Sequence, residues 1–229
     1  MKAGFDQQAL IDLFASASAK QGEQLRQAVR QAVLGALKGR EMSLKNIRDV
    51  LNTVTKAASA GAAQSSLPAV DVQAMLDSAV AGMDDALLKA VEANRVALQQ
   101  FVDQGVGLQE KQLKKAVDEL EKFEDTLLGA VRKAADATSA QMGAPWQQVL
   151  EKLQAGGTLS GAQAATTAEE FTDQMRTTMR ETRAAGLKAA QALAESYAAL
   201  VSGVLIGMSD ALQQGSGASG GAAKKTARK

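Results

Sequence analysis

The side chains that could carry chemistry in this 229-residue chain are carboxylates, amines, guanidinium groups and hydroxyls, because it has no histidine and no cysteine. Zinc sites, haem ligation through histidine, disulfides, thiol nucleophiles and Ser-His-Asp catalysis are therefore excluded. The carboxylates, lysines and hydroxyls that remain form no recognisable catalytic constellation. The composition predicts a protein that is not an enzyme and that uses no cofactor and no metal.

Two short motifs could be taken for ligand sites. Asp84 and Asp85 could be read as a metal-binding pair, but adjacent residues on a helix point about 100° apart. We therefore expect both carboxylates to lie on a solvated face. Gly105-Val106-Gly107 is not a phosphate loop, because the strand and the lysine of such loops are missing.

Helices must position all of these groups. From Pro68 to Met142 apolar residues return every three or four places, which fits one face of an α-helix. A continuous or gently kinked helix over 69–141 would be about 110 Å long. A turn at Gly105–Gly107, folding the segment into a hairpin, is the alternative. The apolar face of this segment, which other long helices or a surface must cover, includes Leu76, Met83, Leu87, Phe101, Leu120, Phe123 and Leu127.

The rest of the chain also has the helical period. Good helix formers dominate, and two prolines in the whole chain permit very long helices. Ser43 is placed to cap a helix start, Pro145 to end the long helix, and Trp146 to fill one end of the bundle. The sequence thus predicts an all-α fold: an elongated bundle of amphipathic helices with coiled-coil-like packing over 1–214. Its helices are expected near 5–38, 44–60, 69–141, 146–155 and 162–214, with a disordered tail over 215–229.

The last predicted helix has no charged residue between Glu195 and Asp210. Such a segment is too short to span a membrane, which needs about 20 apolar residues. Four small residues recur there at every fourth position and would let another helix approach closely, which favours a homo-oligomer. This ridge comprises Ala199, Gly203, Gly207 and Ala211.

The net charge of +1 steers neither a nucleic acid nor a membrane toward the whole chain. The chain is, however, basic at both ends and acidic in its middle. Its basic groups either form a solvated face or contact an anionic surface, and those in the tail could bind nucleic acid weakly. The candidates are Arg26, Arg30, Lys224, Lys225, Arg228 and Lys229. Asp6 lies where a signal peptide needs apolar residues, so we expect a cytoplasmic protein.

Long alanine- and glutamine-rich helices and the tail GAAKKTARK resemble the phasins, which coat bacterial polyhydroxyalkanoate granules. The stretch ETRAAGLKAAQALAESYAALVSGVLIGMSDALQQ is similar to them in composition. The resemblance implies an oligomeric helical protein that coats a hydrophobic polymer or lipid surface. It carries over no residue-level role, because phasins share no catalytic motif.

Three functions therefore stay open. The protein could be a phasin-like coat at a granule surface, or a coiled-coil scaffold that binds another protein. Less favoured is a nucleoid-associated protein that uses its basic termini. Adsorption to hydrophobic particles would favour the first function, and salt-sensitive retention on DNA would favour the third.

Overall fold

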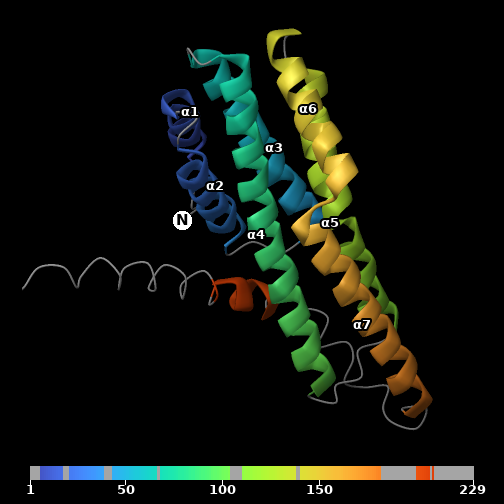
Figure 1. Ribbon diagram of the computed structural model, residues 1–229. Coiled ribbons are helices and arrows are strands. Elements are labelled where there is room, and N and C mark those ends of the chain that lie inside the picture. Colours follow the sequence, from blue (N-terminus) through green and yellow to red (C-terminus); the bar gives the residue numbers. More distant parts are fainter. Residues whose placement is uncertain are drawn as a thin grey trace, which may run out of the picture.

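A computed structural model describes residues 6–17, 21–38, 43–65, 68–103, 110–137, 140–181, 200–206 and 208. These residues form helices and contain no strand, which confirms the all-α prediction (Figure 1). The helices are α1 (Gln7–Ser16), α2 (Gly22–Leu37), α3 (Leu44–Gln64), α4 (Ala69–Asp103), α5 (Glu110–Ala137), α6 (Ala140–Gly156) and α7 (Leu159–Glu181), and a further helical segment covers 200–206.

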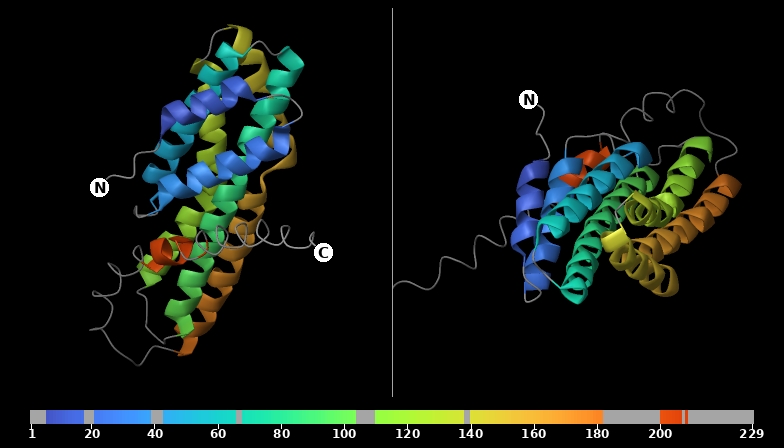
Figure 2. Two further views of the ribbon diagram at one scale, coloured as in Figure 1. Left: turned by 90° about the vertical axis from the view of Figure 1, so that its left-hand side faces the viewer. Right: turned by 90° about the horizontal axis from the view of Figure 1, so that it is seen from above.

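The helices are stacked in three layers, as the view from above shows (Figure 2). The outer layer of α1 and α2 packs on α3 and α4, which form the middle layer. On its other side the middle layer packs against α5, α6 and α7. Below the ends of α2 and α3, the described bundle consists mainly of α4, α5 and α7 (Figure 1).

The prediction of one continuous helix over 69–141 is wrong, and the hairpin alternative is right. α4 ends at Asp103, α5 begins at Glu110, and α5 runs back along the bundle (Figure 1). Glycine costs about 1 kcal/mol against alanine inside a helix, so Gly105 and Gly107 weaken this point. The apolar face also changes phase there. Folding the chain back lets both halves of that face point into one core.

The prediction of a single helix over 5–38 is also wrong. α1 begins at its cap, where the Asp6 carboxylate accepts a hydrogen bond of 3.0 Å from the N–H of Ala9. A second helix then starts at Gly22, where an added Cβ would lie 2.9 Å from Oγ of Ser78. The separation lets α1 pack on α3 while α2 packs on α4.

Other helix bounds differ in detail. α3 begins at Leu44 with Ser43 as its cap, as expected, but it continues past residue 60 to Gln64. α6 begins at Ala140 and contains Pro145, so this proline does not end a helix. The ring removes one backbone hydrogen bond, and burial of the adjacent Trp146 offsets that loss.

The predicted helix over 162–214 is described only in part. α7 begins earlier, at Leu159, and residues 182–199 lie outside the described residues. The short helical segment that follows places Val201 and Leu205 in the core. The tail over 215–229 lies outside the described residues as well.

Alanine is the commonest of the buried apolar residues, and the larger ones fill the spaces between layers. The predicted apolar face of α4 and α5 belongs to this core, except that the side chain of Phe101 is outside the described set. The buried members are Leu76, Met83, Leu87, Leu120, Phe123 and Leu127. Each alanine removes little apolar surface from water, so the core contributes modestly per residue.

Candidate functional site

Asp84 and Asp85 do not share a solvated face, so that expectation is wrong. Asp84 is buried, with 7% of its surface exposed, and points toward the start of α7. Asp85 turns to α2 and binds the guanidinium group of Arg26, with Nε at 2.6 Å and Nη2 at 2.8 Å. The two neighbouring carboxylates therefore tie α4 to two different layers.

The connection between α6 and α7 is a two-residue break. α6 ends at Gly156, and Gly157 has a φ of 69°, a left-handed conformation that favours glycine. Thr158 then caps α7, because its Oγ1 accepts a hydrogen bond of 2.9 Å from the N–H of Gly161. The backbone therefore restarts a helix at once, and its first N–H groups face the carboxylates described next.

Asp84 of α4 satisfies two N–H groups at the start of α7. Its Oδ2 accepts from the N–H of Leu159 at 2.8 Å, and its Oδ1 accepts from the N–H of Ser160 at 3.0 Å. The positive end of the helix dipole stabilises a negative charge at this place. The buried carboxylate thus replaces the solvent that the helix terminus would otherwise need.

Glu124 of α5 supplies the second carboxylate. Its Oε1 accepts from the N–H of Thr158 at 3.0 Å and from the hydroxyl of Thr158 at 3.2 Å. Its carboxyl group also fills the space beside Gly161, where an added Cβ would lie 2.6 Å from Cδ of Glu124. Four consecutive N–H groups that a helix start leaves unpaired are therefore all satisfied. We call Asp84, Glu124 and residues 158–161 the α7 junction.

The α7 junction holds a helix rather than a ligand. Both oxygens of Asp84 are occupied by backbone N–H donors, which leaves little capacity for a metal ion. Within the ranges that the structure describes, no group of three or more His, Cys, Asp or Glu residues could hold a metal. The Ser160 hydroxyl is fully buried and finds no hydrogen-bond partner among the described residues.

A constant register relates α4 to the α6–α7 segment. Asp77 binds Lys152 at 3.0 Å, Asp84 binds Leu159, and Arg95 binds Glu170 at 3.3 Å, each pair 75 positions apart. A constant offset means that the two segments run parallel and that their register is the same before and after the break between α6 and α7. The junction lies between the two surface ion pairs of this series.

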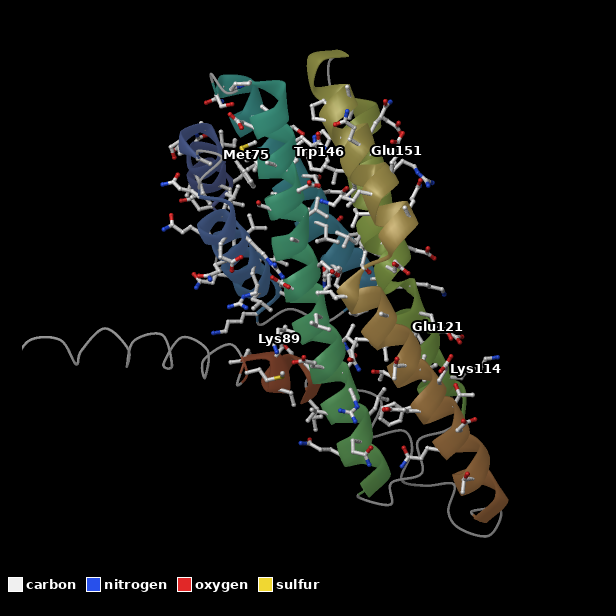
Figure 3. The ribbon with its side chains drawn as sticks, in the orientation of Figure 1. Met75, Lys89, Lys114, Glu121, Trp146 and Glu151 are labelled. Carbon is white, nitrogen blue, oxygen red and sulfur yellow. The ribbon has the colours of Figure 1, made fainter. Side chains whose placement is uncertain are left out.

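Trp146, which the sequence predicts to fill one end of the bundle, belongs to the core. It is fully buried, and its Nε1 donates a hydrogen bond of 2.9 Å to Oγ of Ser59 in α3. It lies in the upper part of the bundle, far from Lys114 and Glu121 on α5 (Figure 3). The α6 helix is thereby anchored to the middle layer.

Of the residues predicted to contact an anionic surface, the structure describes Arg26 and Arg30 and does not describe those of the tail. Arg26 is held by Asp85, and the hydrogen bond with that carboxylate raises the pKa of Arg26 above its ordinary value. Arg30 buries its Nε without a partner among the described residues. The four tail positions, Lys224, Lys225, Arg228 and Lys229, lie outside the described residues. Contact of these groups with an anionic surface stays a prediction, although Nε and Nη2 of Arg26 are bound to Asp85.

Of the predicted small-residue ridge, the structure describes one residue, Gly203. Gly203 is exposed, and an added Cβ there would meet no described atom within 4 Å. Ala199, Gly207 and Ala211 lie outside the described residues. Self-association through this ridge therefore stays a prediction.

Few large hydrophobic side chains are exposed on the part of the bundle that the structure describes. Among the described residues, the large hydrophobic side chains that are exposed are Val96, at 39%, and Leu159, at 58%. Two separate residues do not form the extended apolar patch that marks a docking surface. None of the helices in the described part of the chain has the length and hydropathy that a membrane span requires.

The layers and the α7 junction define an all-α bundle in which carboxylates from neighbouring helices cap the start of another. The chain belongs to DUF6781, a family of unknown function, whose model matches residues 1–214. No curated protein and no solved structure matches the chain.

Proposed function

We propose that this protein is a non-catalytic structural protein that coats an apolar particle, such as a polyhydroxyalkanoate granule, in the manner of the phasins it resembles. This proposal puts the protein at the surface of a cytoplasmic granule. The observation that carries it is the shallow core: the helices bury long apolar faces, but many of the residues in those faces are alanine.

A core of this kind supports coating because opening it costs little per residue. Burial of apolar surface is worth about 25 cal/mol per Å², and an alanine side chain offers little surface. A helix that leaves its neighbours can lie flat on an apolar surface with its charged face in water. Adsorption then exchanges helix–helix contacts for helix–particle contacts and leaves the helices intact.

The scarcity of exposed apolar side chains also supports adsorption by opening of the bundle. Because Val96 and Leu159 are isolated, the described exterior offers no ready adsorption patch. A coat protein built this way stays dispersed when closed and adsorbs when it opens.

The test is co-sedimentation of the purified protein with polyhydroxybutyrate particles, with silica particles as the hydrophilic control. We expect the protein to pellet with the polymer and not with silica, and to keep its helical circular dichroism on the particles. Protein that stays in the supernatant at concentrations where a phasin pellets would overturn the coat proposal. The scaffold function would then be the better account, because it does not require adsorption to an apolar particle.

A matched variant tests whether the bundle must open. Val96→Ser with Leu159→Ser removes the exposed apolar side chains and leaves the core residues in place. We expect adsorption to persist in this variant. Loss of adsorption would show that the closed surface binds the particle, which contradicts the opening step.

A further inference from the structure

Small side chains pack α7 against the bundle. At 159–174 and 177, where side-chain burial is described, the buried residues of α7 are serine, glycine, threonine and alanine, with Phe171 as the one large side chain. Small side chains remove little apolar surface from water, so they contribute little to holding the helix. Hydrogen bonds therefore carry a large share of the attachment of this part of α7.

Those hydrogen bonds are concentrated at one end. Asp84 and Glu124 take the N–H groups of residues 158–160, and bonds to a charged acceptor are stronger than neutral ones. Farther along α7, Arg95 pairs with Glu170, but both side chains are about half exposed. Exposed pairs contribute little. The N-terminal end is the place where α7 is fastened.

A hinge precedes this fastening. Gly156 and Gly157 end α6, and Gly157 already has a positive φ. An added Cβ at Gly156 would meet no described atom within 4 Å, and one backbone hydrogen bond, of 2.8 Å from the N–H of Gly157 to the carbonyl oxygen of Leu153, must break for the chain to rotate there. α6 itself is anchored by the buried Trp146 and Val149. Rotation at these glycines would move α7 and leave α6 in place.

Helical geometry identifies what α7 covers. Residues three and four apart share a helix face, so the face of α4 that carries Asp84 continues through Leu87 and Val91. The face of α5 that carries Glu124 continues back through Leu120 and Val117. All four are buried, and α7 packs on both helices. We call Leu87, Val91, Val117 and Leu120 the covered face.

The closed junction also carries a cost. A buried hydroxyl that lacks a hydrogen-bond partner is unfavourable relative to one in water, and Ser160 has no partner among the described residues. Release of α7 would return this group to water. The carboxylate hydrogen bonds therefore stabilise the α7 junction, whereas burial of the Ser160 hydroxyl destabilises it.

We infer that α7 is a releasable strap: Asp84 and Glu124 latch its start, the glycines at 156–157 are its hinge, and its release uncovers the covered face. The occupant of that face is the apolar particle surface of the proposed function, on which this inference rests. Aliphatic side chains aligned on two adjacent long helices match a surface that offers apolar contact and no hydrogen bonds.

The first experiment measures release without any particle. Hydrogen exchange is followed in the full-length protein and in Asp84→Asn with Glu124→Gln. We expect the amides of residues 159–171 to exchange faster than those of α3 in both proteins, and about tenfold faster or more in the variant than in the wild type. Asp85→Asn is the matched control, because it removes the neighbouring carboxylate and leaves the latch. Exchange in α7 that is unchanged in the variant, or that is no faster than exchange in α3 in the wild type, would overturn the strap.

The second experiment locks the strap. The chain has no cysteine, so Glu124→Cys with Gly161→Cys can form one disulfide within the molecule. An added Cβ at Gly161 would lie 2.6 Å from Cδ of Glu124, and thiol titration checks that the disulfide has formed before adsorption is measured. We expect the oxidised form to lose adsorption to polyhydroxybutyrate particles at least tenfold and the reduced form to regain it.

The outcomes separate the strap from the coat. Equal adsorption of oxidised and reduced protein overturns the strap and leaves the coat function standing. Faster exchange in α7 without adsorption of any form upholds the strap and overturns the coat function.

Discussion

Asp84 and Ser160 lie 76 positions apart in the chain, and the Asp84 carboxylate accepts a hydrogen bond of 3.0 Å from the backbone N–H of Ser160. A long-range contact of this kind does for α7 what a local cap does for most helices. It also makes the start of α7 depend on the position of α4.

Replacement of Asp84 should cost far more than replacement of its neighbour. Asp84→Ala leaves two N–H groups at the start of α7 without an acceptor, which we expect to lower the free energy of unfolding by about 2–4 kcal/mol. Asp85→Ala breaks a partly exposed ion pair and should cost about 1 kcal/mol or less. Urea denaturation of both variants measures the difference. Equal losses would mean that Asp84 is not the buried cap.

Two glycines should be intolerant of a methyl group. An added Cβ at Gly61 would lie 2.4 Å from Cβ of Phe14, and one at Gly82 would lie 2.4 Å from the carbonyl oxygen of Arg26. Gly61→Ala and Gly82→Ala should each lower stability by about 1–3 kcal/mol, because backbone or packed atoms must shift.

Gly35 and Gly129 are the matched controls. Both lie inside helices, and an added Cβ at either would meet no described atom within 4 Å. Gly35→Ala and Gly129→Ala should therefore raise stability by about 0.5–1 kcal/mol through helix propensity. Thermal melts of the four variants check the contrast, and a uniform sign across them would contradict the close helix approaches.

Local signals in the sequence were enough to predict the fold class and several helix ends. The three-to-four spacing of apolar residues showed which segments are helical but not where the predicted helices over 5–38 and 69–141 are divided, and Ser43 marked the start of α3. The spacing also held a clue to the α7 junction, because Val80, Met83, Asp84 and Leu87 share one face, which places Asp84 among buried residues. The expectation that Asp84 and Asp85 both lie on a solvated face did not take this spacing into account.

Long-range features could not be predicted in this way. The partner of Asp84 is backbone N–H, which every residue except proline has, so no side-chain pattern marks it. Whether the chain folds back between α4 and α5 depends on two opposing free energies. One is the cost of keeping two glycines inside a helix, and the other is the gain from the apolar surface that is buried when the chain folds back. That gain comes from contacts among distant helices, which periodicity within one segment does not contain.

Arg26 should matter for stability and not for binding to anionic surfaces. Its guanidinium group is held by Asp85, so Arg26→Gln should leave binding to anionic lipid vesicles unchanged within about twofold. Co-sedimentation with vesicles of mixed neutral and anionic lipid measures this. A large loss of vesicle binding in Arg26→Gln would show that the arginine leaves Asp85 to meet the surface.

The Arg26 contribution to stability should not vary with pH near neutrality. Its pKa is raised in the folded protein by the hydrogen bond with Asp85, which outweighs partial burial. A raised pKa of a cationic group contributes stability that is fully present below the ordinary arginine value and is lost only as the pH rises past the raised one. The stability difference between wild type and Arg26→Gln should thus show no step from arginine titration between about pH 6 and pH 10.

The tail should act only through its charge. Removal of residues 215–229 deletes Lys224, Lys225, Arg228 and Lys229 and no residue of the described bundle. We expect unchanged helicity and an unchanged melting temperature, together with loss of any low-salt DNA binding, because such binding depends on phosphate neutralisation. DNA binding that survived truncation in physiological salt would shift the nucleic-acid function to the N-terminal helices.

The hydrogen bond between Trp146 and Ser59 should be measurable as a coupling between two helices. Ser59→Ala leaves the buried indole N–H without its acceptor, and we expect a loss of about 1–3 kcal/mol. In a Trp146→Phe background the same change should cost clearly less, because phenylalanine has no donor to satisfy. Ser78→Ala is the control, since the Ser78 hydroxyl bonds only to its own helix among the hydrogen bonds described, at the carbonyl oxygen of Ala74. A double-mutant cycle in urea gives the coupling free energy, and a value near zero would mean that α6 is held on α3 by packing alone.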